Sequence, residues 1–466
     1  MNSQLFTKWS AKYFLIGLCC VLLLIVPLLR GPWIGTESFL YARLAEDPSW
    51  FDALSFGGRF AAYPWGTPLT LSIAPGTLIE ILPFVLGILS FLLFRKILQR
   101  FTDDHVIVSL SSLFLILSPT FLYTFSFTNS LFIATFLALV AFALFLSPKW
   151  KWYAVPIVII LPMFNIVLTS ALLLALFFLS FSIEKKQKKF FLVLLVITLL
   201  AAGGYYGYMI SQTGFPHSFV PEESRAFEVF QQFFFDLGAP YGLGIFLALL
   251  GAIGAWRLWD KKYTNLFVFF SVTFFLLFSF FRSENLVFLN FFLVFLAAYG
   301  FRHLTQITWS DNTYRFMVFL IIVSGTVFSA VSQIDQLTDA PPTPAMMEGL
   351  VFISQLEPGV VFTDYTRGVW VNSAGHENVM DENVLFVPDV ATRWNDTTAL
   401  YYSRDFEVTE ALFTTYNVSY VWIDEEMKEK IWSYDTEGLL FILQYTSGFN
   451  KIYDKNGVEI WRVRYD

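Results

Sequence analysis

Long apolar runs separated by short polar segments dominate the hydrophobic pattern of the chain. A membrane helix needs about 20 residues to cross roughly 30 Å of hydrocarbon, and nine runs approach or reach that length. They cover residues 11–29, 77–94, 104–118, 128–146, 190–210, 241–256, 264–281, 286–300 and 315–332. A further run, 153–182, is interrupted by Pro162 and Asn165, so we expect two helices there, the first of them short, that meet in a hairpin. The pattern predicts a polytopic α-helical membrane protein with eleven crossings.

The positions of lysine and arginine predict how these helices are oriented. With the N-terminus inside, the cytoplasmic segments hold 16 Lys and Arg residues, and the outer segments of the membrane part hold 5. Such an excess on the cytoplasmic side is the rule for membrane proteins. A single crossing of the run 153–182 would place the lysine-rich segment 184–189 outside, so the charge distribution requires two crossings joined by a hairpin. We expect an integral plasma-membrane protein with a cytoplasmic N-terminus and an extracytoplasmic C-terminal domain.

Residues 333–466 differ in charge from the rest of the chain. They hold 9 Lys and Arg against 22 Asp and Glu, a net charge of −13. Residues 1–332 hold 21 against 15, a net charge of +6. The shift indicates a membrane domain over 1–332, including a first outer loop at 30–76, followed by a water-soluble domain. A proline-rich linker is expected at 333–345, and the soluble domain at 346–466.

The soluble part alternates strand-like and helix-like segments. Short β-branched or aromatic runs predict strands at 360–362, 369–371, 384–387, 418–423, 451–454 and 458–464, and a helix is expected at 407–416. Asn456-Gly457 lies between the last two strands and is a strong hairpin signal. We therefore expect a small mixed α/β domain.

Composition excludes several other classes of protein. Hydrophobic residues make up 56% of the chain and charged residues 14%, against about 25% charged in an average soluble domain. Disordered, collagen-like and disulfide-rich chains are excluded by the apolar content and by the presence of only two cysteines. Because the tail is acidic and the chain has no basic stripe interleaved with aromatics, we expect no nucleic-acid partner.

The first outer loop carries the most informative residues. Residues 35–43 read G-T-E-S-F-L-Y-A-R, and residues 55–66 read S-F-G-G-R-F-A-A-Y-P-W-G. Thr36 is an expected helix N-cap, and apolar residues follow it at helical spacing. A short helix lying in the membrane interface would hold Glu37 at its N-terminus.

These two stretches resemble motifs of membrane glycosyltransferases of the GT-C type. The first is similar to the G-x-D-S-Y-Y-H-L-R stretch of archaeal-type oligosaccharyltransferase catalytic subunits and their paralogues, and the second to their SfGGR…YPpG stretch. Glu37 stands in the place of the family's catalytic Asp, Ser38 and Arg43 match, and Tyr41 stands where His is usual. The resemblance is specific in the first loop and weak over the rest of the chain.

The resemblance implies a glycosyltransferase whose sugar donor is linked to a polyprenyl (dolichol-type) phosphate or diphosphate in the outer leaflet. Glycosyl transfer passes through an oxocarbenium-like transition state, which requires a base for the acceptor and stabilisation of the leaving phosphate. Glu37 is the expected catalytic base, and arginine suits phosphate oxygens. The expected donor-phosphate ligands are Arg43, Arg59 and Arg282, and the expected substrate-binding residues are Tyr41, Tyr63, Trp65 and Glu80.

The chain departs from the oligosaccharyltransferase pattern at two places. The next outer loop, 119–127, has no acid, although the family carries there a second acidic motif that helps to hold a divalent metal. Residues 364–368 stand where the family has W-W-D-Y-G, and they lack its two tryptophans. These departures favour metal-independent transfer to a lipid or glycan acceptor. A protein acceptor and a divalent cofactor, Mg²⁺ or Mn²⁺, stay open, the latter through His217 and nearby acids in the outer loop 211–240.

Each candidate also has a structural interpretation. Glu37 could simply stabilise a helix dipole, Arg43 could pair with Glu46 or Asp47, and Arg282 could pair with Glu284. Two other functions are compatible with the sequence: a non-catalytic GT-C paralogue that acts as a scaffold, and a transporter of lipid or polysaccharide. Transporters usually carry inverted repeats and charged or Gly/Pro-interrupted midplane helices, whereas the helices expected here are almost uncharged and unrepeated.

Overall fold

The computed structural model describes residues 2–181, 185–215, 231–262, 265–387, 389–434 and 436–464. It divides into two compact units, which we describe one at a time. Unit 1 takes residues 1–32, 64–205 and 223–339, and unit 2 takes residues 33–63, 206–222 and 340–466. Most of the first outer loop thus belongs to the same unit as the C-terminal residues, a grouping that the sequence pattern did not predict.

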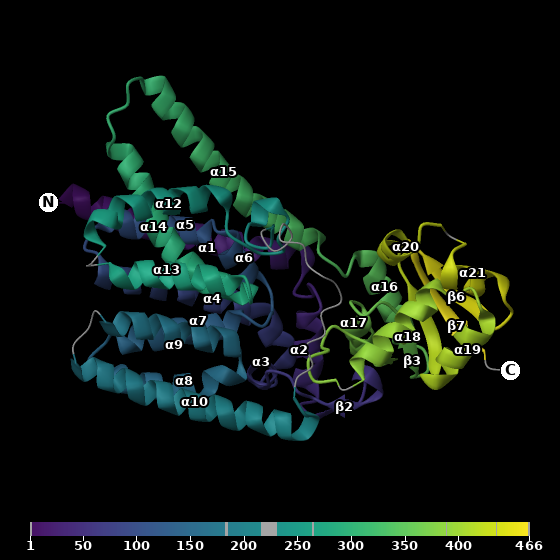
Figure 1. The fold of residues 1–466 in the computed structure, drawn as a ribbon. Coiled ribbons are helices and arrows are strands. Elements are labelled where there is room, and N and C mark those ends of the chain that lie inside the picture. Colours follow the sequence, from purple (N-terminus) through teal and green to yellow (C-terminus); the bar gives the residue numbers. More distant parts are fainter. Residues whose placement is uncertain are drawn as a thin grey trace. The chain divides into compact units, whose positions relative to one another are not determined.

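Unit 1 is built from helices, most of them apolar (Figure 1). Its α-helices are α1 (Asn2–Arg30), α3 (Gly66–Leu71), α4 (Pro75–Phe101), α5 (His105–Ile116), α6 (Pro119–Ser126), α7 (Phe132–Phe145), α8 (Ala154–Ile160), α9 (Ile166–Phe181), α10 (Lys185–Thr213, whose end lies in unit 2), α12 (Ile245–Leu258), α13 (Leu266–Ser279), α14 (Leu286–Gln306) and α15 (Asn312–Asp339). Short 3-10 turns lie at η2 (Lys151–Tyr153), η3 (Leu161–Met163), η4 (Phe235–Leu237), η5 (Trp259–Lys261) and η6 (Ser283–Asn285).

Five helices among the described residues are long and apolar enough to cross a membrane, namely α1, α4, α10, α14 and α15. The pair α5 and α6, bent by 60°, makes a sixth candidate if it is one span. The remaining predicted spans coincide with shorter apolar helices. The number of crossings therefore stays a prediction, while the helical character of every predicted span agrees with the structure.

Two local predictions in unit 1 have different outcomes. The run 153–182 is broken as expected, because η3 separates α8 from α9 around Pro162. The predicted outer segment 119–127 contains a short helix, α6, which the sequence pattern did not predict, and its position relative to the membrane stays a prediction. The Ser118 side chain caps α6 by accepting a hydrogen bond from the Phe121 amide, and Pro119 takes the first turn, where its missing N–H does no harm.

Helices α12 and α14 approach so closely that their backbones touch. A Cβ atom added to Gly254 would lie 1.9 Å from the carbonyl oxygen of Leu296, and one added to Gly300 would lie 2.1 Å from that of Leu250. Small residues at such crossings allow the close van der Waals packing that membrane helices rely on, because lipid provides no hydrophobic drive.

Unit 2 contains a five-stranded mixed sheet with helices around it (Figure 1). The strand order is β4-β3-β5-β7-β6; β3 runs parallel to β4 and β5, and β7 runs antiparallel to β5 and β6. The strands are β3 (Val360–Phe362), β4 (Glu377–Asn378), β5 (Val418–Ile423), β6 (Phe449–Lys455) and β7 (Val458–Val463). The helices are α16 (Pro344–Ile353), α17 (Gly368–Ser373), α18 (Val390–Tyr402), α19 (Phe406–Thr415), α20 (Glu425–Ile431) and α21 (Gly438–Tyr445).

The first loop adds its own elements to unit 2. They are α2 (Glu37–Glu46), η1 (Ser55–Gly57) and a two-stranded ribbon of β1 (Phe51–Asp52) and β2 (Arg59–Phe60). The helix predicted after Thr36 is therefore confirmed.

The strand predictions in unit 2 are confirmed at β3, β5 and the β6–β7 hairpin, and wrong at two places. Residues 369–371 lie in α17, and residues 384–387 form no strand. The apolar side chains at 384–387 pack into a compact cluster instead of a sheet. In this cluster Val387 lies with Val390, Phe56 and Met380. The expected linker at 333–345 is also helical as far as Asp339, since Gln333, Ile334 and Leu337 are buried on α15.

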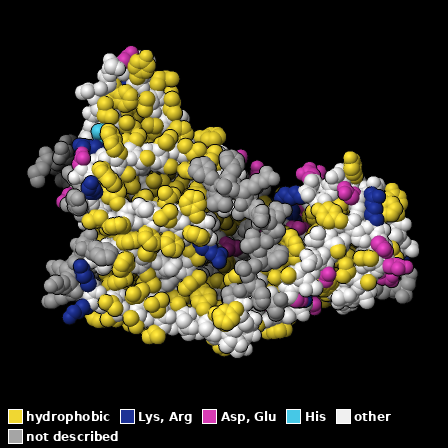
Figure 2. All heavy atoms as spheres, in the orientation of Figure 1, with side chains coloured by type: hydrophobic (Ala, Val, Ile, Leu, Met, Phe, Trp, Pro, Cys, Tyr) yellow, Lys and Arg dark blue, Asp and Glu magenta, His cyan; other side chains and the backbone are white. Residues whose placement is uncertain are grey.

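The surfaces of the two units differ in chemistry. Hydrophobic side chains cover much of unit 1, whereas acidic side chains are frequent on unit 2 (Figure 2). Exposed residues of unit 1 include Phe14, Leu200, Leu277 and Phe328, on α1, α10, α13 and α15. Large apolar side chains in such numbers suit hydrocarbon as the surrounding solvent.

We predict that the G254A substitution lowers the stability of unit 1 by roughly 1–3 kcal/mol, because the added methyl group forces α12 away from α14. The unfolding of the purified full-length chain in detergent, followed by heat or by SDS titration, measures this. G203A on α10 is the matched control, since a Cβ there meets nothing within 4 Å. Equal stability of G254A and wild type would contradict the contact.

Candidate functional site

The turn before α2 fixes the position of Glu37. Gly35, at a φ of +66°, donates its amide to the carbonyl oxygen of Pro341 at 2.9 Å and accepts the indole N–H of Trp370 at 3.0 Å. The hydroxyl of Ser38 donates to the Ile34 carbonyl at 2.8 Å and accepts the Ile34 amide at 3.1 Å. Glu37 is thus the first residue of α2, and the hydrogen bonds of Gly35 before it and Ser38 after it fix the turn that leads into this helix.

A second carboxylate from the C-terminal part lies next to this helix start. The Thr36 hydroxyl donates to Oε2 of Glu382 at 2.6 Å instead of capping its own helix. Glu37 is half-buried, and Glu382 is exposed. Desolvation by the surrounding protein and the negative charges of Glu37, Asp381 and Asp364 raise the pKa of Glu382 to about 7, and the Thr36 hydroxyl opposes the rise.

The S-F-G-G-R stretch forms a tight reversal in which three successive residues have positive φ: Phe56 at 55°, Gly57 at 73° and Gly58 at 103°. Glycine adopts this conformation without steric cost, but for Phe56 it costs roughly 1–2 kcal/mol. Two contacts compensate for that strain. The Phe56 amide donates to Oδ1 of Asn378 at 2.9 Å, and the guanidinium of Arg59 lies 4.9 Å from the ring centre of Phe56.

The reversal brings four polar residues of the first loop into one network. Arg43 binds Asp52 through two parallel hydrogen bonds of 2.6 and 2.7 Å. The buried Tyr63 donates its hydroxyl to Asp52 at 2.9 Å and accepts from Arg59 at 2.7 Å. Burial alone would raise the pKa of Asp52, but the guanidinium of Arg43 holds it below its ordinary value.

A short turn, Asp381–Asn383, attaches the C-terminal part to this network. The buried Asp381 accepts the Ser55 hydroxyl at 2.6 Å, and the Arg59 guanidinium lies 3.7 Å from its other oxygen. Arg59 also donates to the carbonyl oxygen of Asn383 at 2.6 Å and to the Ser55 hydroxyl at 2.9 Å. We call these contacts of Ser55 and Arg59 with Asp381 and Asn383 the loop clamp. It holds Glu382, the residue between its two anchors, beside Thr36.

The predicted site residues divide between the two units. Glu37, Tyr41, Arg43, Arg59 and Tyr63 belong to unit 2, and Trp65, Glu80 and Arg282 belong to unit 1.

The predicted residues of unit 2 are mostly engaged inside it. Tyr41 is buried in α2, and the guanidinium groups of Arg43 and Arg59 hold the first loop. A donor-phosphate role for these two arginines stays a prediction. Arg43 pairs with Asp52, so the alternative of a pair with Glu46 or Asp47 is not what the structure has.

The predicted residues of unit 1 lie in different settings. Trp65 is buried, and its backbone amide donates to the Tyr205 hydroxyl at 2.9 Å. Glu80 is exposed on α4. Arg282 is exposed immediately before η6.

The motif-like residues 364–368 form the turn between β3 and α17. Arg367 is buried there and binds Asp424 at 3.0 Å and Glu426 at 2.5 Å, so it ties the turn to the end of β5. A Cβ atom at Gly368 would lie 2.3 Å from the carbonyl oxygen of Met380, which explains the glycine. The turn therefore supports the chain directly before the loop clamp.

No group of three or more His, Cys, Asp or Glu side chains that could hold a metal ion occurs among the described residues. The outer-loop candidate for a metal site lies mostly outside them, because His217 and the acids that follow it up to residue 230 fall in the undescribed segment 216–230.

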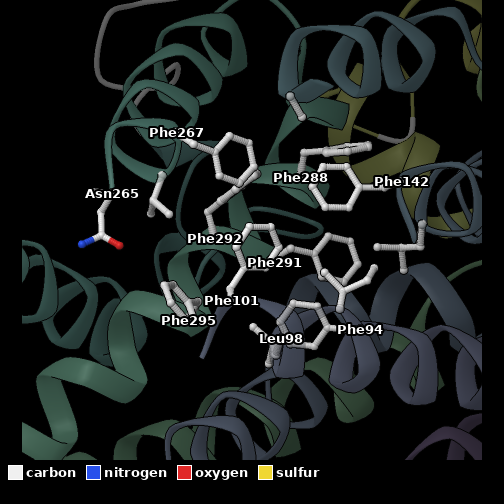
Figure 3. Close-up of a pocket in the computed structure, with 14 residues that line it drawn as sticks. Phe94, Leu98, Phe101, Phe142, Asn265, Phe267, Phe288, Phe291, Phe292 and Phe295 are labelled. Atoms are coloured by element: carbon white, nitrogen blue, oxygen red, sulfur yellow. The ribbon is translucent and has the colours of Figure 1, made fainter. Parts of the chain in front are cut away.

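An apolar cavity of about 160 Å³ lies in unit 1 between α4, α7, α9, α13 and α14 (Figure 3). Most of its wall consists of phenylalanine rings, among them Phe94, Phe142, Phe267 and Phe292, and Asn265 adds a polar group at one side. A wall of this kind offers no hydrogen-bond partner to a sugar and suits an apolar chain.

A groove of about 260 Å³ lies on unit 2. Trp33, Phe39 and Trp370 give it flat aromatic walls, while Arg43 and Glu46 add a hydrogen-bond donor and an acceptor. Aromatic faces combined with charged hydrogen-bonding groups can bind a sugar ring or another amphipathic ligand.

Sequence reasoning missed Asp381, Glu382 and Asn383. A signal was present, because Asp and Asn residues clustered at 378–383 favour a turn over the strand that was expected nearby. Nothing local in the sequence indicates that this turn meets Ser55, which lies 326 positions earlier.

Comparison with known proteins gives matches at the level of structure. No protein-family model matches the chain, and no curated protein matches its sequence. The oligosaccharyltransferase of Archaeoglobus fulgidus, solved with a tethered acceptor peptide, matches with a TM-score of 0.60 and 13% identity over 98% of this chain and 75% of that one. The archaeal oligosaccharyltransferase AglB, also from Archaeoglobus fulgidus and solved in complex with an inhibitory peptide and a dolichol-phosphate, matches with a TM-score of 0.59 and 13% identity over the same shares.

ArnT from Cupriavidus metallidurans, in the apo state, matches with a TM-score of 0.57 and 10% identity over 97% of this chain and 98% of that one. These matches cover both units, and oligosaccharyltransferases and ArnT are glycosyltransferases of one structural class. The chain has the fold of the GT-C membrane glycosyltransferases.

Proposed function

We propose that this protein is a GT-C glycosyltransferase that moves a sugar or oligosaccharide from a polyprenyl (dolichol-type) phosphate or diphosphate to an acceptor outside the cytoplasm. Glu37 is the base that takes the proton of the acceptor. The observation that carries the proposal is the braced start of α2, which holds this half-buried carboxylate in the first loop of a GT-C fold. AglB, with the same fold, has been solved with a dolichol-phosphate, which supports a lipid-linked donor.

The three predicted arginines are assigned different roles in this proposal. Arg43 and Arg59 keep the first loop in shape, because their guanidinium groups are engaged with Asp52, Ser55 and Asn383. Arg282 is the exposed one of the three, and we assign the leaving phosphate to it.

The apolar cavity of unit 1 suits the donor, and the groove of unit 2 suits the acceptor. The phenylalanine-lined cavity accepts part of the polyprenyl chain of the donor, because an isoprenoid is apolar and flexible. The aromatic groove of unit 2 accepts a glycan or another amphipathic acceptor. A divalent metal would supply charge stabilisation to the leaving phosphate, and the transfer proposed here assigns it no ligand.

The E37Q substitution should abolish transfer, because the amide keeps the shape of the side chain and cannot accept a proton. Removal of a general base lowers rates by about 10²–10⁴-fold. Membranes that carry the wild-type or variant chain, supplied with a labelled polyprenyl-linked donor pool, measure it. E407Q, which changes an exposed carboxylate in the first turn of α19, is the matched control and should retain activity.

Undiminished transfer by E37Q would remove Glu37 from the mechanism, and no transfer by a folded wild-type chain would favour the scaffold function. A parallel assay with EDTA tests the metal. Loss of activity with the chelator would indicate metal ligands, with Glu80 and the segment 211–240 examined next.

The A175F substitution should weaken the use of long-chain donors. Ala175 is buried on α9 and lines the cavity, so a phenyl ring there fills the space available to the isoprenoid. We expect KM to rise several-fold for a donor with a long polyprenyl chain and to stay unchanged for the same sugar phosphate esterified to a short alkyl group, which does not fill the cavity. Equal effects on both donors would remove the cavity from donor binding.

A further inference from the structure

The loop clamp delivers a carboxylate to the start of α2. On one side of Glu382, Asp381 accepts hydrogen bonds from the Ser55 hydroxyl at 2.6 Å and the Asn378 amide at 3.1 Å. On the other side, the carbonyl oxygen of Asn383 accepts from Arg59 at 2.6 Å. Both neighbours of Glu382 are thereby fixed, which leaves its side chain to reach Thr36, the residue immediately before Glu37.

The surroundings of Glu382 favour its protonated form. Desolvation by the surrounding protein raises its pKa most, and the negative charges of Glu37 on α2, Asp381 in the clamp and Asp364 in the turn after β3 raise it further. Solvent reaches the side chain of Glu382, so a proton held there can exchange with water. Because the side chain of Glu382 is exposed to solvent, dissolved salt screens the neighbouring negative charges that raise its pKa.

We infer that Glu382 is the proton partner of Glu37: held beside Thr36 by the loop clamp, it receives the proton that Glu37 takes from the acceptor and releases it to solvent. This inference rests on the function proposed above for Glu37. The acceptor oxygen forms a bond to the anomeric carbon, and the bond from that carbon to the donor phosphate breaks with the electron pair staying on the phosphate. The acceptor proton passes to Glu37, then to Glu382, then to water.

Glu382 does not touch substrate in this scheme and acts through Glu37, so it is a positioning and relay residue. A purely structural role, as a hydrogen-bond acceptor for Thr36, is the competing explanation. E382Q separates the two, because the amide oxygen still accepts the Thr36 hydroxyl while the side chain no longer binds a proton.

The first test needs no substrate. The full-length chain in lipid nanodiscs is titrated with acid and base while infrared difference spectra follow the stretching band of protonated carboxyl groups. We expect a component that titrates near pH 7, is absent in E382Q, and moves to lower pH in E37Q because one like charge is gone. E46Q is the control and leaves the component in place. If the infrared component persists in E382Q, or titrates at the same pH in E37Q as in wild type, the pairing of Glu382 with Glu37 is wrong.

The second test measures transfer from the labelled polyprenyl-linked donor pool across the neutral pH range. E382Q should lose rate by less than the 10²–10⁴-fold of a missing base and should lose the pH dependence near 7. If E37Q is inactive while E382Q keeps the wild-type rate and pH profile, the relay is wrong and the proposed function stands. If E37Q is fully active, the proposed function itself fails.

The raised pKa also predicts how stability depends on pH. The folded chain holds a proton on Glu382 up to about pH 7, whereas the unfolded chain releases it near the ordinary value of 4.5. Between these values the folded state binds more protons, so the contribution of Glu382 to stability decreases as the pH rises. Relative to wild type, E382Q should therefore become more stable as the pH increases from 5 to 8, values that bracket this window. Parallel stability curves for the two chains would contradict the shift.

Discussion

The loop clamp is the contact on which the organisation of unit 2 depends. It joins residues more than 320 positions apart through Ser55 and Arg59 on one side and Asp381 and Asn383 on the other. Asp381 is buried, and a buried carboxylate is costly unless it is paired and hydrogen-bonded. The clamp satisfies it with a hydroxyl, two amide groups and a nearby guanidinium. Beside the clamp, the Phe56 amide donates to Asn378 and compensates for the positive φ of Phe56, so the loop and the C-terminal part specify each other's shape.

Several consequences for the candidate site follow from this constraint. The first loop does not behave as a free connection between two membrane helices, because the C-terminal residues hold both of its motif-like stretches. Glu37 is placed by Gly35 and Ser38, and the clamp holds Glu382 where the charge of Glu37 raises its pKa. In the account proposed here, the chemistry of the loop therefore depends on residues that the membrane domain does not contain.

The sequence predicted these features to different degrees, and the reasons are physical. Apolar runs, the Pro162 break and the Asn456-Gly457 hairpin depend on local patterns, and each agrees with the structure. The start of α2 was predictable for the same reason, since glycine, a capping residue and helical spacing lie within ten positions. The clamp could not be predicted from the sequence, because its partners are distant in the chain and neither stretch is unusual by itself. The strand prediction at 384–387 was wrong because β-branched side chains suit a packed cluster as well as a strand.

The proposed reaction removes a sugar from a polyprenyl-linked donor. The most direct measurement follows the donor itself: purified full-length protein in liposomes that contain a labelled polyprenyl-phosphate sugar pool, with mass spectrometry of the lipid products over time. We expect sugar-free polyprenyl phosphate or diphosphate to accumulate in equal amount to glycosylated acceptor. A folded protein that leaves the whole donor pool intact, with every candidate acceptor class present, would contradict the proposed reaction.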